Sequence, residues 1–312
     1  MYQNSKITAL ESYRQKVRVR VNIVLSGSSG FVGEALALKL LSIGHNVYGI
    51  DQRIGKFSIP NFIKSNLEDM TVFDSIPENA TFIHLAAVST DKDCANDPIG
   101  AINSNLQATA KLAQLAEMKK ANKFIFASSE WVYPESTTPK LNFENETLDL
   151  RNLNSLYAMT KLFGENLLRS MNVTNLVTLR FGIVYGPRLI GGSAFESVVR
   201  MTKEKTQIEL GALNTARRFI HVSDLVDGLV EVCSKTNFEI KDPIYNFAGT
   251  ELITLKEIAL ETSRIMGVKR ELIDLGKTPS IRNPISDSAY KYFNWVPKYD
   301  LSAGIQDYLS IT

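Results

Sequence analysis

The stretch "GSSGFVG", residues 27–33, decides the fold. It follows a β-branched run that begins at Val17 and reads as a buried strand, and it opens a helical pattern that stops at Gly44. Between a strand and a helix, Gly27 permits a tight turn, Gly30 lets the backbone approach a pyrophosphate, and Gly33 lets the helix pack closely on the sheet. Free N–H groups at the helix start then face the anion. The motif therefore predicts a dinucleotide-binding turn, with an ordinary glycine-rich turn as the alternative.

Asp51 favours the first interpretation. It ends the next predicted strand, "NVYGID", residues 46–51. A carboxylate at that place can accept hydrogen bonds from both ribose hydroxyls and repels a 2′-phosphate, so it indicates NAD and not NADP as the cofactor. Arg53 could serve such a phosphate, although a solvated surface charge is the commoner role of a nearby arginine.

Strands and helices alternate through the first two thirds of the chain. Further strands are predicted at residues 80–87, 122–129 and 175–182, with helices at 103–119 and 155–170 between them. This alternation predicts an α/β fold, with a doubly wound parallel sheet of the Rossmann type.

The last third of the chain is less regular. Residues 244–249 read as a strand, and a helix follows Thr254, with Glu257 completing a capping box. We expect residues 1–180 to form an NAD-binding domain to which 220–245 return. Residues 181–219 and 246–312 would form a smaller C-terminal α/β region that binds the substrate.

Composition narrows the class of protein. A net charge of +2 gives no electrostatic case for nucleic acid or a membrane surface, and no apolar run has the length of a membrane span. Cys94 and Cys233 are far apart and lack metal-ligand spacing, so we expect a reducing, cytoplasmic location and no metal site. Residues 1–16 are too polar for a signal peptide and predict a short amphipathic helix or a disordered arm.

Tyr157 and Lys161, in "YAMTK", stand four residues apart in a predicted helix. They therefore share one helix face, where an ammonium group would lower the pKa of the phenol and help it to accept a proton. Such a pair alone is common on amphipathic helices. It gains weight here because it follows a nucleotide loop and the serine-bearing strand end "ASSEWVY".

The Gly-x-x-Gly-x-x-Gly spacing together with Tyr157 and Lys161 resembles the short-chain dehydrogenase/reductase superfamily. The length and later segments resemble its extended branch of nucleotide-sugar epimerases, dehydratases and reductases, over residues 19–297. These segments are "NLED" (66–69), "HLAA" (84–87), "NLQAT" (105–109), "LRFGIVYGPR" (179–188), "RRFIHVSD" (217–224) and "NWVP" (294–297).

The resemblance implies a set of site residues. The catalytic residues would be Ser129, Tyr157 and Lys161, and the substrate would contact Ser129, Glu130, Arg217 and Arg282. NAD would contact Gly27, Ser29, Gly30, Phe31, Val32, Gly33, Asp51, Gln52, Asn66, Leu67, Leu85, Ala86, Ala87, Asn105, Tyr157 and Lys161. The resemblance also implies a homodimer formed through the helices at 103–119 and 155–170, while His84 and His221 are expected to be structural.

The leading functional prediction is an NAD-dependent nucleotide-sugar epimerase that acts at C4 through a transient 4-keto sugar. Trp131 stands where dehydratases of this kind carry a second acid–base carboxylate, so ordinary 4,6-dehydration lacks a group, and Ile183 replaces an asparagine that several epimerases use. One alternative is an NAD(P)-dependent 4-keto-sugar reductase or dehydrogenase. Another is a non-catalytic regulator that senses dinucleotides, because a fold alone does not fix a function.

Overall fold

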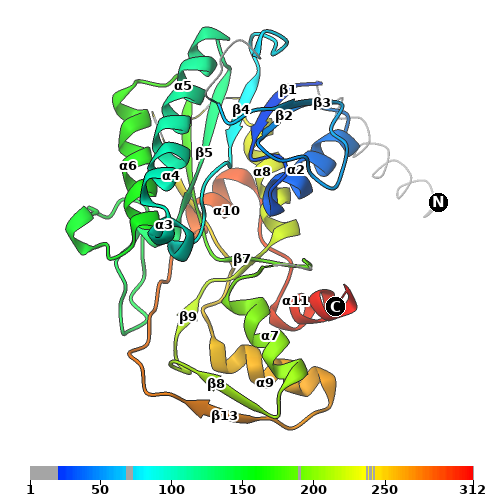
Figure 1. The fold of residues 1–312 in the computed structure, drawn as a ribbon, viewed down its shortest axis with the longest axis vertical. Helices are drawn as coiled ribbons and strands as arrows, with labels where there is room; N and C mark the ends of the chain where they lie inside the picture. The colour runs from blue at the N-terminus through cyan, green and yellow to red at the C-terminus, as the bar shows by residue number, and fades with distance from the viewer. Residues whose placement is uncertain are drawn as a thin grey trace, which may run out of the picture.

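The computed structural model describes residues 20–67, 73–188, 191–236, 238, 241 and 243–311. Its centre is a seven-stranded sheet in which every pair of neighbouring strands is parallel (Figure 1). The strand order is β11-β6-β5-β4-β1-β2-β3. The strands are β1 (Asn22–Ser26), β2 (Asn46–Asp51), β3 (Asn61–Lys64), β4 (Thr81–His84), β5 (Lys123–Ser129), β6 (Leu176–Phe181) and β11 (Ile244–Phe247). This order confirms the predicted doubly wound α/β fold.

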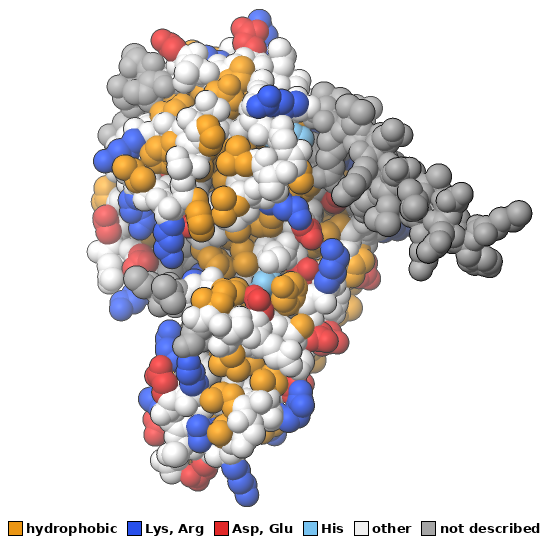
Figure 2. Space-filling model, turned by 90° about the vertical axis from the view of Figure 1, so that its right-hand side faces the viewer, with side chains coloured by type: hydrophobic (Ala, Val, Ile, Leu, Met, Phe, Trp, Pro, Cys, Tyr) orange, Lys and Arg blue, Asp and Glu red, His pale blue; other side chains and the backbone are white. Residues whose placement is uncertain are grey.

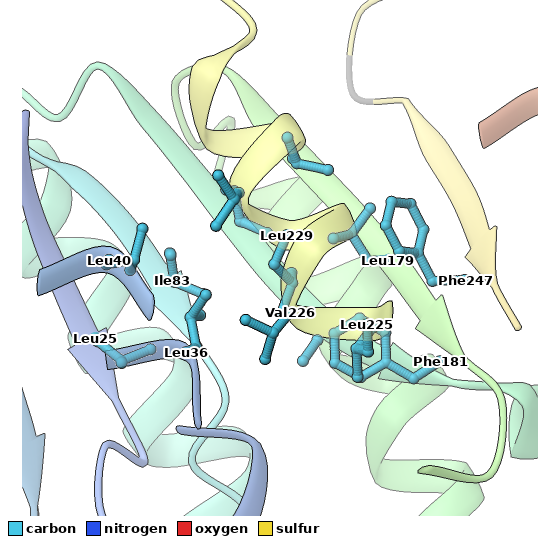
Figure 3. Close-up of a cluster of buried hydrophobic side chains, with 14 of the residues drawn as sticks. Leu25, Leu36, Leu40, Ile83, Leu179, Phe181, Leu225, Val226, Leu229 and Phe247 are labelled. Carbon is cyan, nitrogen blue, oxygen red and sulfur yellow. The ribbon is translucent and has the colours of Figure 1, made fainter. Parts of the chain in front are cut away.

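Helices cover both faces of this sheet. In β1, Ile23 and Leu25 pack toward α2 (Phe31–Ser42) and α8 (Val222–Ser234), whereas Val24 packs toward α5 (Ala108–Met118) and α6 (Leu156–Ser170). Figure 3 shows the first of these cores, where leucines of α8 lie between side chains of α2 and those of β6 and β11. Because the central strands are buried on both faces, they read in the sequence as continuous apolar runs.

The helix boundaries follow local signals that the sequence carries. Ser155 caps α6 by accepting a hydrogen bond from the N–H of Ala158, and Thr254 and Glu257 form the expected capping box of α9 (Leu255–Met266). The predicted helix at 103–119 begins with a π-helical turn, η2 (Asn103–Gln107), before α5. Shorter elements that the sequence analysis did not identify are α3 (Asp91–Asn96), α4 (Pro98–Ile102), η3 (Glu130–Val132) and η4 (Leu150–Asn152).

The smaller part of the molecule lies beyond one end of the sheet (Figure 1). It contains α7 (Ala194–Glu204), α9 and α11 (Leu301–Ile311), packed with the parallel pair β8 (Gln207–Leu210) and β13 (Glu271–Asp274) around its own core. Two short pairings lie at the junction: β7 (Val184–Tyr185) with β10 (Ile220–His221), and β9 (Ala216–Arg217) with β12 (Ile253–Thr254). From the last third of the chain, α10 (Asp287–Phe293) returns to pack against β11 and α8.

The surface carries mixed charges. On the face drawn in Figure 2, Lys and Arg side chains are interspersed with Asp and Glu side chains, which agrees with the small net charge of the chain. Among the described residues, no helix is long and apolar enough to cross a membrane. The polar segment 1–16 and residues 68–69 of "NLED" lie outside the described residues.

Candidate active site

A cavity of about 810 Å³ opens at the carboxyl ends of the sheet strands. Its walls include the glycine-rich turn after β1, Asp51 at the end of β2, and Ser129 at the end of β5. On the far side it is closed by the smaller part of the molecule, through Arg217 of β9 and Leu255 at the start of α9. In doubly wound folds, ligands bind at this edge of the sheet.

The glycine-rich turn is shaped for close backbone approach. Gly27 has a φ of 73°, and a Cβ there would lie 2.6 Å from the N atom of Ala86. A Cβ on Gly33 would lie 2.0 Å from the carbonyl oxygen of Gly27. Gly30 is the N-cap of α2 and provides no side-chain cap, so N–H groups of the first turn are left for an anion. These residues fit the pyrophosphate of a dinucleotide.

Asp51 is held firmly at the rim of this cavity. Its two carboxylate oxygens accept hydrogen bonds from the backbone N–H groups of Ser29 and Arg53, each at 3.0 Å. The Ser29 hydroxyl donates to the carbonyl of Arg53 at 2.7 Å, and Ser29 is not among the cavity-lining residues. Ser29 therefore orients Asp51, and the carboxylate keeps further lone pairs for ribose hydroxyls.

The other predicted cofactor contacts divide into two groups. Most of them line the cavity, namely Phe31, Val32, Gln52, Asn66, Leu67, Leu85, Ala86 and Ala87. Asn105 does not. Its side chain accepts from the N–H of Val88 at 2.8 Å and donates to the Val88 carbonyl at 3.0 Å. Asn105 thus fixes a loop that does line the cavity, at Val88.

Ser129, Tyr157 and Lys161 come together at the centre of the cavity wall. A side-chain hydrogen bond joins Tyr157 to Ser129. The Lys161 ammonium lies 5.9 Å from the centroid of the Tyr157 ring and donates to the carbonyl of Ala127 at 2.7 Å. A proton-accepting phenol, a hydroxyl and a cation therefore face one space, which is the set that alcohol oxidation needs.

The expected lowering of the Tyr157 pKa is not what the structure shows. Burial raises the pKa of Tyr157 to about 12, and the hydrogen bond with Ser129 opposes this rise. Burial also lowers the pKa of Lys161 to about 8. Because Lys161 donates to a backbone carbonyl and makes no direct bond to the phenol, its effect on Tyr157 is weaker than the helix spacing suggested.

The predicted substrate residues do not share one surface. Arg217 lines the cavity, whereas Glu130 and Arg282 lie behind its wall. Nε of Arg217 lies 3.0 Å from a carboxylate oxygen of Glu130, and Nε of Arg282 donates to the carbonyl of Tyr133 at 2.9 Å. Of the predicted substrate residues, Ser129 and Arg217 are therefore placed to touch a ligand without rearrangement.

The two histidines with expected structural roles are buried, and His221 also lies 3.1 Å from a carboxylate oxygen of Asp307. His84 lies between Ser26 and Thr109, at 2.6 and 2.7 Å from their hydroxyls, and burial lowers its pKa to about 3. His221 is the N-cap of α8 and accepts a hydrogen bond from the N–H of Ser223. Neither lines the cavity, so neither is a general base for its ligand.

Sequence reasoning missed Arg188 as a wall residue. Its guanidinium stacks on the ring of Phe31 at 4.1 Å and donates to Glu196 at 2.8 Å. The contact joins the loop after β7 to the glycine-rich turn, so the two halves of the cavity meet there. Arg188 ends the segment "LRFGIVYGPR", and that segment was the available signal.

Comparisons with known proteins agree with this geometry. Residues 23–248 match the model of the NAD dependent epimerase/dehydratase family. The "Uncharacterized UDP-glucose epimerase YtcB" of Bacillus subtilis is 29% identical, over 81% of this chain and 84% of that protein. "UDP-glucuronate 4-epimerase 2" of Arabidopsis thaliana is 25% identical, over 96% of this chain and 77% of that protein.

Solved structures show the same fold. UDP-glucuronic acid 4-epimerase from Bacillus cereus, in complex with UDP-glucuronic acid and NAD, superposes with a TM-score of 0.79 at 24% identity. The alignment covers 93% of this chain and 98% of that one. The family match spans most of the chain and includes the glycine-rich turn, Asp51 and the Ser129, Tyr157 and Lys161 group. The chain therefore belongs to the NAD dependent epimerase/dehydratase family, and it is an enzyme with NAD as its cofactor.

Proposed function

We propose that this enzyme is an epimerase of nucleotide sugars that inverts C4 through a transient 4-keto sugar. One observation carries the proposal: Ser129, Tyr157 and Lys161 line the same cavity as the glycine-rich turn and Asp51. Relatives named as UDP-glucose and UDP-glucuronate epimerases support the reaction class and the substrate class.

The cofactor half of the cavity supports a set of roles toward NAD. The first turn of α2 would bind the pyrophosphate, and Asp51 would accept hydrogen bonds from the hydroxyls of the adenosine ribose. Lys161 would face the ribose at the nicotinamide end. When bound, NAD supplies a reversible hydride acceptor, and its oxidised nicotinamide adds positive charge.

The proton chemistry belongs to Tyr157 and Ser129. Tyr157 accepts the proton of the C4 hydroxyl while that carbon is oxidised, and returns the proton once the keto sugar has presented its other face. Because burial raises the pKa of Tyr157 to about 12, the phenol needs positive charge nearby to act as a base. Lys161 provides part of that charge. Ser129, hydrogen-bonded to Tyr157, relays the proton and orients the hydroxyl.

The wall around Tyr157 argues against dehydration. Trp131 lines the cavity with its ring centroid 6.0 Å from that of Tyr157, in an edge-on arrangement. An indole has no basic group that could remove a proton from C5 of a sugar. Epimerisation needs only the oxidation and reduction of one carbon, for which the side chains present are sufficient.

Assembly and location form the finer part of the proposal. Exposed apolar side chains lie along α4, α5 and α6, namely Ile99, Ile102, Met118, Met159 and Phe163. These helices lie together on one side of the molecule (Figure 1). They support a homodimer formed through that side. Cys94 and Cys233 are free thiols, which supports a reducing, cytoplasmic location.

The division of labour along the chain is part of the same proposal. Residues 1–180 and 220–245 serve NAD, and residues 181–219 and 246–312 serve the substrate. The membership of β11 in the large sheet and the separate core around α7 and α9 support this division. Because α10 returns to the large sheet, residues 246–312 do not all pack in the smaller part of the molecule.

Isotope transfer tests the reaction. UDP-glucose carrying deuterium at C4 is incubated with the enzyme, and the sugar product is analysed by NMR and mass spectrometry. An epimerase that returns the same hydride retains the deuterium at C4 in the epimer and causes no net change in NADH absorbance. Net formation of NADH indicates a dehydrogenase instead. Loss of deuterium to solvent excludes the hydride mechanism.

A further inference from the structure

Four charged side chains gather behind Ser129, at the sugar end of the cavity. They are two arginines, Arg217 and Arg282, and two glutamates, Glu130 and Glu135. Nε of Arg217 lies 3.0 Å from Glu130, and a terminal nitrogen of Arg282 lies 3.3 Å from Glu135. With both glutamates ionised, this cluster carries no net charge.

Arg217 already has partners for most of its donors, whereas Nη1 of Arg282 is buried without a hydrogen-bond partner. Arg217 donates to the carbonyls of Ala216 and Ser280 and to the Ser280 hydroxyl, at 2.8, 2.5 and 2.7 Å. The guanidinium of Arg282 lies 4.8 Å from the centroid of the Trp131 ring. Only Arg217 of the four reaches the cavity, and its charge is neutralised from behind by Glu130, which is fully buried.

The other lining cations of the described residues lie away from this wall or are engaged elsewhere, and of these Arg188 has a carboxylate partner. Lys161 donates to the carbonyl of Ala127, and Arg188 pairs with Glu196 while it stacks on Phe31. Arg53 lies beside Asp51, at the adenosine end. The remaining wall near Ser129 is uncharged and is made by Trp131, Ile183, Thr215, Phe219 and Leu255.

This arrangement has a consequence for a sugar bound at Ser129 and Tyr157. A carboxylate on the sugar would leave water for a wall near Ser129 whose lining cation, Arg217, is already paired with Glu130, and burying an unpaired charge is costly. The hydroxymethyl group of a neutral hexose does not meet this penalty.

We propose, resting on the nucleotide-sugar function above, that the substrate carries an uncharged hexose and not a uronic acid, and that Glu130 determines this preference. Glu130 acts by neutralising the charge of Arg217, so that a sugar carboxylate finds no free cation there. This is selection against the wrong substrate, a common route to specificity. The relatives include enzymes named for both sugar types, so the distinction is a real one within the family.

The protonation state of Glu130 determines the pH at which the sugar preference should be measured. Burial raises the pKa of Glu130 to about 7, and the positive charges of Arg217 and Arg282 oppose the rise. Glu135 and Tyr157 are the other titratable groups near it. At pH 8 Glu130 is therefore mostly ionised and neutralises Arg217.

The test compares UDP-glucose with UDP-glucuronate at pH 8, by calorimetric affinity and by kcat/KM for epimerisation. We expect the wild type to favour UDP-glucose by at least about ten-fold. In Glu130→Gln, which keeps the shape and removes the charge, this preference should shrink by at least about ten-fold, the effect of roughly 1.4 kcal/mol. Glu135→Gln removes the same charge from a half-exposed rim position and should change the preference by less than about three-fold.

Each outcome has a distinct meaning. If the wild type uses both sugars equally, or prefers the uronate, the inference is wrong, and this result needs no variant. If Glu130→Gln leaves the preference unchanged, or Glu135→Gln alters it as strongly, Glu130 is not the determinant. If neither nucleotide sugar binds or reacts, the proposed function itself fails.

Discussion

The ammonium of Lys161 lies 5.9 Å from the centroid of the Tyr157 ring and donates its hydrogen bond to the carbonyl of Ala127. The two residues thus share a cavity wall without a direct bond, and the phenol keeps a high pKa of about 12. The cation is nevertheless fixed in position, because a strand carbonyl anchors it. We therefore expect the charge and hydroxyl groups of bound ligands to complete the site in the space between the two side chains.

Tyr157→Phe should lower kcat by at least about 100-fold, because it removes the proposed base and leaves the ring in place. NAD affinity should change little, since the phenol is not among the groups that bind the pyrophosphate or the adenosine ribose. Steady-state kinetics with UDP-glucose and calorimetry with NAD measure the two effects. Turnover at the wild-type rate, with chemistry limiting, would rule out Tyr157 as the base.

Asp51 should make the enzyme select NAD. Its carboxylate is held by the N–H groups of Ser29 and Arg53, and it would face the 2′-position of the adenosine ribose. Calorimetry should show wild type binding NAD more tightly than NADP. In Asp51→Ser that preference should fall by at least about ten-fold, since a charge-assisted hydrogen bond is worth roughly 1.5–3 kcal/mol.

Arg53→Gln is the matched control for this experiment. The Arg53 side chain is exposed and lies next to Asp51 at the same end of the cavity. If Arg53 only carries a solvated charge, the preference for NAD stays as in wild type. If wild type binds NADP as tightly as NAD, and Arg53→Gln loses the NADP binding, then Arg53 and not Asp51 determines which cofactor is bound.

Much of this fold was accessible from sequence because its signals are local. The five predicted strands of the first part all lie in the sheet, and the capping box at Thr254 and Glu257 forms as expected. The short strands β8 and β13 were missed because they pair across a long stretch of chain, with too few residues to show a period. A strand is recognised in a sequence from apolar residues that recur at a fixed spacing, and a strand of two to four residues is too short to show such a recurrence.

The candidate site also divides into predicted residues that reach the cavity and predicted residues that do not. Residues on the glycine-rich turn and at strand ends reach the cavity, because the topology of a parallel sheet places strand ends together. Asn105 and Arg282 do not, since their side chains satisfy backbone groups at Val88 and Tyr133. The choice between facing a ligand and fixing a loop depends on tertiary hydrogen bonds, which residue type and spacing do not encode.

Arg217→Ala should weaken the binding of UDP by about ten-fold, the low end of the effect of a charge-assisted contact, because Glu130 already offsets part of the charge of Arg217. Arg282→Ala should have a smaller effect, since Arg282 lies behind the wall. Calorimetric titration of uridine, guanosine, thymidine and cytidine diphosphates measures this, with NAD affinity as the control. Wild type that binds none of them, or an Arg217→Ala variant that binds like wild type, would exclude recognition of the diphosphate by Arg217.

Lys123 should stabilise the protein from inside the sheet. Its ammonium donates to the carbonyls of Val232 at 2.7 Å and Cys233 at 3.3 Å, and also to that of Lys235, where α8 ends. Lys123→Met removes this buried donor from the three helix-end carbonyls, of which that of Val232 keeps a 3.4 Å bond from the N–H of Lys235, and should reduce the free energy of unfolding by about 3 kcal/mol.

Urea denaturation monitored by circular dichroism measures that change, with Lys120→Met as the control. Lys120 makes an exposed ion pair with Glu78, so its loss should cost less than about 1 kcal/mol. Equal destabilisation by the two variants would show that the contacts at the end of α8 contribute nothing specific.

Glu130 should make stability fall as the pH rises, opposite to the usual effect of a paired carboxylate. Burial raises its pKa in the folded protein to about 7, above the ordinary 4.5. The folded state therefore binds the proton more tightly than the unfolded state, so its contribution is complete below about pH 4.5 and is lost as the pH rises through 7. Glutamine does not titrate, and the free energy of unfolding of wild type relative to Glu130→Gln should fall between pH 5 and pH 8 by up to about 3 kcal/mol.

The nearby charge of Arg217 works against this trend. Denaturation of both proteins across that range decides which effect dominates: a difference that grows with pH would mean that the ion pair outweighs burial and holds Glu130 ionised throughout.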